Sequence, residues 1–79
     1  GAGFGAARPA VQEALTARQR EVLWLLAEGK SNKVIARQLD MSENTVRNHV
    51  AAILDRLGVD NRLEAAAAAR RLGLLQEGA

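Results

Sequence analysis

The chain has 79 residues, a formal net charge of +2 at pH 7 and no cysteine. A chain of this length holds one small domain with a marginal core, and without cysteine it can form neither disulfides nor thiolate metal sites. The single histidine cannot build a multi-histidine metal site, and an aromatic content of 3% leaves little material for stacking on single-stranded nucleic acid. The positive charge allows an anionic partner without requiring one.

The sequence contains no pattern typical of an enzyme. It has no nucleophile beside a base, no pair of carboxylates suited to one cleft and no glycine-rich phosphate loop, so we expect neither catalysis nor a cofactor. No apolar run approaches the roughly 20 residues of a membrane span, and no secretory signal is visible. We expect a cytoplasmic protein with no membrane partner, because the lack of cysteine is compatible with a reducing compartment.

Taken in chain order, residues 1–14 are rich in glycine and alanine and predict a flexible linker or N-terminal extension. The domain proper, residues 15–79, is expected to open with an amphipathic helix. Thr16 followed by Gln19 is the capping-box pattern, and Gly29 fits the end of this helix. Its apolar stripe consists of Val22, Leu23 and Leu26.

A second, shorter helix is expected from Lys33 to Leu39, capped by Ser31 or Asn32. Only the tripeptide AspMetSer separates it from the next helical pattern. Two helices joined by so short a turn form a helix-turn-helix. Asp40 stands where such turns often carry glycine, and Asp and Asn are the next most tolerant of a left-handed backbone.

The third helix, from Ser42 to Leu57, has an aliphatic side and a polar side. Ser42 is a good N-cap, and Gly58 fits a left-handed C-terminal stop. At 3.6 residues per turn the side expected in the core carries Val46, Val50, Ile53, Leu54 and Leu57. The opposite side carries Asn44, Arg47, Asn48 and Ala51.

These outward residues are the types that read a DNA major groove. Arg can make two hydrogen bonds to guanine, and Asn can make two to adenine. A methyl side chain lets the helix approach a thymine methyl. Asp55 would repel DNA, so only the N-terminal half of the helix is expected to enter the groove. Beside this side runs a stripe of residues spaced three or four positions apart, which is well placed to contact DNA phosphates. It consists of Thr45, His49, Ala52 and Arg56. On this stretch alone an ordinary amphipathic helix with a solvated polar face stays open.

A fourth helix is expected from about Arg62 to Leu72, with Asn61 and Glu64 in capping positions and Gly73 at the end. It has two apolar faces, one with Ala65, Ala69 and Leu72 and the other with Leu63, Ala66 and Ala67. One face covers the domain, and the second is free for a partner subunit. The predicted dimer contacts are Leu63, Ala66, Ala67 and Arg70. Alternatively, the alanine run only favours helix formation, and the second face marks no subunit contact.

The stretch LTARQREVLWLLAEGKSNKVIARQLDMSENTVRNHVAAILDRLGVDNRLEA resembles the LuxR-type helix-turn-helix domain of NarL/FixJ response regulators and quorum-sensing regulators. The resemblance implies an all-α, compact four-helix domain that controls transcription by binding inverted DNA half-sites as a homodimer. It implies base contacts at the positions of Arg47, Asn48 and Ala51. Relatives often carry Lys or Arg where this chain has Ala51, so we expect specificity to depend on Arg47 and Asn48. The full set of predicted phosphate contacts is Asn32, Lys33, Ser42, Thr45, His49 and Arg56.

The resemblance also implies a regulatory domain on the N-terminal side and RNA polymerase as a further partner. A hypothesis of a different class is a helical protein-interaction module that docks a receiver domain or polymerase. A sigma-factor region with a similar helix-turn-helix is another alternative, but the LeuGlyValAspAsnArg continuation into a fourth helix speaks against it.

Overall fold

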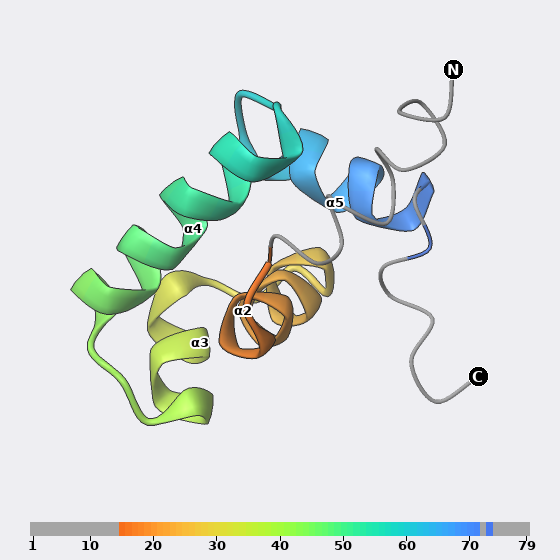
Figure 1. The fold of residues 1–79 in the computed structure, drawn as a ribbon. Coiled ribbons are helices and arrows are strands. Elements are labelled where there is room, and N and C mark those ends of the chain that lie inside the picture. The colour runs from red at the N-terminus through yellow and green to blue at the C-terminus, as the bar shows by residue number, and fades with distance from the viewer. Residues whose placement is uncertain (1–14, 72, 74–79) are drawn as a thin grey trace, which may run out of the picture.

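The computed structural model describes residues 15–71 and 73, and it confirms the expected all-α class (Figure 1). The helices are α2 (Ala17–Ala27), α3 (Asn32–Leu39), α4 (Glu43–Leu57) and α5 (Arg62–Arg71). The predicted extension at residues 1–14 lies outside the described residues, as does Leu72, the expected last residue of the fourth helix. No helix in the described part is long and apolar enough to cross a membrane.

Side-chain caps begin the helices close to where the sequence predicts them. The Thr16 hydroxyl accepts the backbone N–H of Gln19 at 3.0 Å, and the Gln19 side chain accepts the N–H of Thr16 at 3.0 Å. Ser31 rather than Asn32 caps α3, because its hydroxyl accepts a backbone N–H three residues further on at 3.2 Å. Therefore α3 begins one residue earlier than expected, and Asn32 occupies its first position.

The helix that follows the last turn is capped in a similar way. Asn61 Oδ1 accepts the backbone N–H of Glu64 at 2.9 Å, and the Glu64 carboxylate accepts the N–H of Asp60 at 3.0 Å. Left-handed residues close the two preceding helices, Asp40 with φ 57° after α3 and Gly58 with φ 69° after α4. Both positions were predicted from the few residue types that tolerate this conformation.

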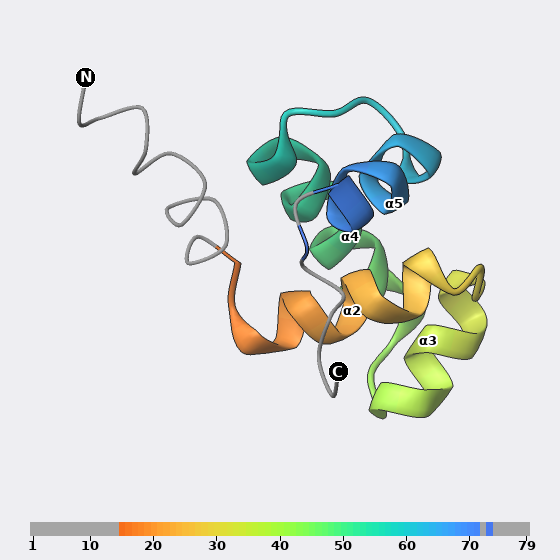
Figure 2. The same ribbon diagram turned by 90° about the vertical axis from the view of Figure 1, so that its right-hand side faces the viewer.

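Two helices form the centre of the domain. α2 and α4 contact each other and also contact both α3 and α5, which flank this pair (Figures 1 and 2). The largest fully buried side chains are Leu15, Val22, Leu23, Ile35, Val46 and Ile53. Leu54 and Leu57 are partly buried against this core. Within the described ranges no polar or charged side chain is buried, so the core is held by aliphatic packing.

The expected division of the fourth helix into two apolar faces is only partly correct. Ala65 and Ala69 are buried as predicted, but Ala66 is only 8% exposed and belongs to the same core. Placing Ala66 on the free face was therefore wrong. The alanine run looks alike on every side, so tertiary contacts rather than sequence periodicity decide how this helix is rotated.

Candidate DNA interface

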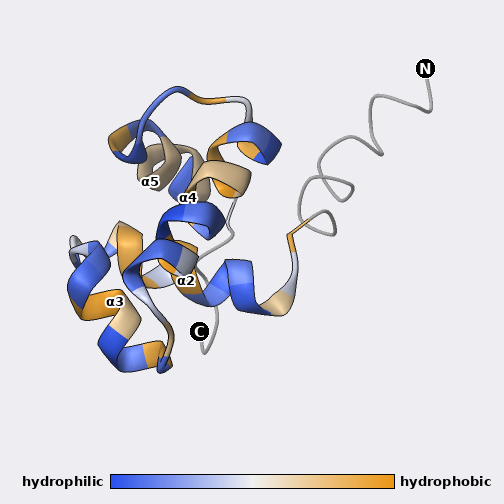
Figure 3. Cartoon of the chain, turned by 90° about the vertical axis from the view of Figure 1, so that its left-hand side faces the viewer, coloured by the Kyte–Doolittle hydropathy of each residue, from blue (hydrophilic) through white to orange (hydrophobic). Residues whose placement is uncertain are grey.

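α3 and α4 form the helix-turn-helix, and α4 is its exposed second member. Val46, Val50 and Ile53 anchor one side of α4 in the core. Figure 3 shows hydrophilic and hydrophobic stretches alternating along both helices, as expected for amphipathic elements at a surface. Because its aliphatic side is fixed, α4 has only one side to offer a ligand.

The outer side of α4 presents all of the predicted base-contacting residues to solvent. Asn44, Arg47, Asn48 and Ala51 are exposed. The Arg47 guanidinium donates to Asn44 Oδ1 at 3.4 Å. A hydrogen bond of this length at an exposed site is weak, so a stronger acceptor can replace it. Arg47 therefore keeps donors available for a ligand in front of the helix.

The first turn of α4 combines capping with the predicted phosphate contacts. The Ser42 hydroxyl accepts the backbone N–H of Thr45 at 3.0 Å and donates to Thr45 Oγ1 at 2.9 Å. The Ser42 hydroxyl thus bonds both the backbone and the side chain of Thr45 and holds the first turn of α4 in place. Further along, His49 is half-buried, whereas Arg56 is exposed.

The start of α3 carries the other predicted phosphate contacts, and a residue not predicted for the site supports them. Lys33 is exposed and Asn32 is half-buried. Arg62, from the first position of α5, donates through Nη1 to Asn32 Oδ1 at 2.8 Å and through Nη2 to the carbonyl of Lys30 at 2.8 Å. The sequence gives no local signal for this contact, because the partners lie 30 and 32 residues apart.

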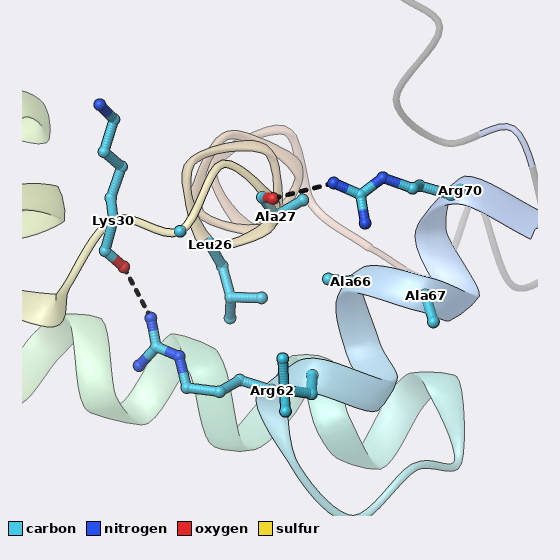
Figure 4. Close-up of a pocket in the computed structure, with 9 residues that line it drawn as sticks. Leu26, Ala27, Lys30, Arg62, Ala66, Ala67 and Arg70 are labelled. Atoms are coloured by element: carbon cyan, nitrogen blue, oxygen red, sulfur yellow. Dashed lines mark hydrogen bonds between the residues drawn. The ribbon is translucent and has the colours of Figure 1, made fainter.

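A shallow groove of about 230 Å³ lies between the C-terminal end of α2 and α5 (Figure 4). Leu63, 82% exposed, and Ala67 lie on its α5 side. Arg70 closes one part of it by donating to the carbonyl of Ala27 at 3.2 Å. Of the predicted dimer contacts, Leu63, Ala67 and Arg70 are therefore at the surface, and Ala66 forms part of the groove floor.

The charge around the helix-turn-helix is mixed. Lys33, Arg47 and Arg56 are exposed cations, whereas Glu43 and Asp55 are exposed anions on α4. Glu43 lies in the first turn, where a negative charge favours the positive end of the helix dipole. In the part of the chain that is described, no cluster of three or more His, Cys, Asp or Glu side chains is arranged to hold a metal ion.

Comparisons with known proteins agree with this geometry. Residues 13–69 match the model of the family described as "Bacterial regulatory proteins, luxR family". The chain is 45% identical to the spore germination protein GerE of Bacillus subtilis (strain 168) over 62 residues, covering 78% of this chain and 84% of GerE. It is 46% identical to the transcriptional regulatory protein DesR of the same organism over 59 residues, which cover 75% of this chain and 30% of DesR.

Solved structures show the same fold. The transcription factor GerE aligns with a TM-score of 0.71 at 45% identity, covering 76% of this chain and 90% of that chain. The response regulator ChrA of a heme-sensing two-component system aligns with a TM-score of 0.73 at 47% identity, covering 76% of this chain and 30% of that chain. The chain thus spans less than a third of DesR and of ChrA. The helix-turn-helix, the match over residues 13–69 and these relatives show that the chain belongs to the luxR family of bacterial regulatory proteins, as a helix-turn-helix DNA-binding domain.

Proposed function

We propose that this domain binds double-stranded DNA sequence-specifically, with the N-terminal half of α4 in the major groove. The observation that carries the proposal is the exposure of Arg47 and Asn48 on the side of α4 opposite its buried aliphatic residues. Arg and Asn make the bidentate contacts to guanine and adenine that distinguish base pairs. Asn44 and Ala51 complete the reading face on the same side of the helix.

Contacts to the DNA backbone position this helix. Thr45, His49 and Arg56 flank the reading side of α4, and Lys33 and Asn32 lie at the start of α3. Contacts of this kind fix the register of a protein on the duplex without reading its sequence. Ser42 contributes mainly as the N-cap, which holds the first turn of α4 in place.

A two-fold dimer on inverted half-sites completes the proposal. Leu63 is the exposed large hydrophobic side chain among the described residues, and Ala67 lies one turn further along α5. Burying a leucine side chain stabilises an interface by roughly 1.5–3 kcal/mol, and a two-fold axis doubles this contribution.

The shares of DesR and ChrA that the chain leaves uncovered support a separate regulatory domain in the whole protein.

The test begins with selection of bound duplexes from a random pool, which yields half-site sequence and spacing together. A variant with Arg47→Ala and Asn48→Ala is then compared with wild type on the selected duplex and on a scrambled one. Each bidentate contact is worth about 1–3 kcal/mol, so losing both should lower the preference for the selected duplex by about thirtyfold or more. The helical circular dichroism should not change, because both side chains are exposed.

Arg18→Gln is the matched control, because it removes an exposed positive charge from α2, where Arg18 pairs with Glu21 at 2.9 Å. This variant should keep the wild-type preference. A folded double variant that still prefers the selected duplex would contradict base reading by α4. If the wild-type chain selects no sequence but captures a receiver domain or RNA polymerase, the protein-interaction hypothesis replaces the proposal.

A further inference from the structure

Arg62 joins the start of α5 to the start of α3, a part of the proposed DNA interface that lies about 30 residues earlier in the chain. Its guanidinium spans from the first position of α5 to the segment that leads into α3, as Figure 4 shows for the bond to the carbonyl of Lys30. Its second bond goes to the side-chain oxygen of Asn32. Both distances are 2.8 Å, short for N–H···O bonds, and both bonds are partly buried.

The chemistry of this contact fixes the orientation of the Asn32 amide. A guanidinium only donates hydrogen bonds, so the Asn32 atom that faces it must be the acceptor oxygen. The amide nitrogen, which carries two donor hydrogens, then points away from Arg62. Without Arg62 the amide has no charged donor to hold it and can rotate between two orientations.

We propose that Arg62 is a positioning residue for DNA binding: by holding Asn32 Oδ1, it turns the Asn32 amide N–H donors toward a phosphate beside Lys33. This inference rests on the proposed function. Side-chain amides are common donors to DNA phosphates, and a donor fixed in advance loses less entropy when the phosphate arrives. The bond to the Lys30 carbonyl holds the neighbouring backbone in the same way.

The first variant separates positioning from folding. Asn32→Asp keeps an acceptor for Arg62, and a negative charge at the first position of α3 suits the helix dipole, so the unfolding temperature should not fall. The variant has no amide donor and brings a negative charge to the phosphate. Its affinity for DNA should drop about tenfold or more, the effect of losing a hydrogen bond to a charged group.

The second variant removes the positioning group itself. Arg62→Met should weaken DNA binding about fivefold more than Arg20→Met does. Arg20 is the matched control because its guanidinium also makes a partly buried hydrogen bond to a backbone carbonyl, that of Leu15 at 2.9 Å, and it belongs neither to the proposed DNA interface nor to the predicted dimer contacts. Arg62→Lys keeps the charge but lacks the planar fork, so its affinity should fall between those of wild type and Arg62→Met.

Fluorescence anisotropy of the 79-residue chain with a labelled duplex of arbitrary sequence, at low ionic strength, measures these affinities. Phosphate contacts are independent of base sequence, so this probe does not depend on base reading by α4. A double-mutant cycle completes the test: in an Asn32→Ala background, Arg62→Met should cost no more affinity than Arg20→Met.

Three results would overturn the inference. If Arg62→Met lowers the unfolding temperature but binds the duplex as well as Arg20→Met does, Arg62 is merely structural. If its effect persists undiminished in the Asn32→Ala background, Arg62 contacts DNA directly. If the wild-type chain binds the arbitrary duplex weakly but reads a selected one, and no Asn32 variant changes either affinity, the positioning role fails while the proposed function stands.

Discussion

Asp40 is the non-glycine residue with a positive φ in the described part of the chain, and it forms the turn of the helix-turn-helix. A left-handed conformation costs an ordinary L-residue about 1–2 kcal/mol, which only glycine avoids and which Asn and Asp tolerate best. The narrow choice of residue types is why the sequence predicted both Asp40 and Gly58 correctly.

Two substitutions at this scale should have opposite effects. Asp40→Gly should raise the free energy of unfolding by up to about 1 kcal/mol, because it relieves the left-handed strain and removes a negative charge from the C-terminal end of α3. Gly58→Ala should lower the free energy of unfolding by about 1 kcal/mol. The cause is backbone strain alone, because a Cβ added at Gly58 would meet no atom within 4 Å. Urea unfolding followed by circular dichroism measures both effects. A Gly58→Ala protein as stable as wild type would show that a left-handed conformation at this position causes no strain.

At the scale of helices, the buried side of a helix could be predicted where aliphatic and polar side chains alternate along it, but not where the side chains are nearly all alanine. α4 mixes aliphatic and polar residues, so its periodicity fixed which side is buried, from Val46 to Ile53. In α5 the alanines gave no such contrast, and Ala66 turned out to lie in the core. The contact from Arg62 to Asn32 was missed for another reason, since no local pattern reports a contact between residues 30 positions apart.

The N-cap of α4 gives a test at this scale. Ser42→Ala removes the acceptor for the backbone N–H of Thr45 and should lower the free energy of unfolding by about 1 kcal/mol. Ser31→Ala at α3 is the matched control and should cost a similar amount, because its hydroxyl caps in the same way. Chemical denaturation of the two variants compares them directly; a Ser42→Ala protein as stable as wild type would show that the cap does not hold α4.

At the scale of the whole molecule, the core and the exposed face of α5 should respond differently to substitution. Ile53 is fully buried, so Ile53→Ala should cost about 2–5 kcal/mol, a large part of the roughly 5–15 kcal/mol that stabilises a small domain. Leu63 is 82% exposed, so Leu63→Glu should leave the unfolding of the monomer almost unchanged.

The same leucine variant tests the proposed dimer. Sedimentation equilibrium over a range of concentrations should show weaker self-association of Leu63→Glu than of wild type, because the substitution places a charge in the proposed apolar contact. Glu43→Gln, at an exposed position at the start of α4 and away from the groove beside Leu63, serves as the control and should associate as wild type does. Equal association of all three proteins would exclude the Leu63 face as the subunit contact.

The most direct test of DNA reading by α4 is a nuclear magnetic resonance titration of the chain with a duplex that it selects from a random pool. The largest shifts should fall on the side chains of Arg47 and Asn48 and on the backbone from Asn44 to Ala51, with smaller changes at the start of α3. Shifts centred on the groove around Leu63, with the outer side of α4 unchanged, would contradict the proposal that α4 reads DNA.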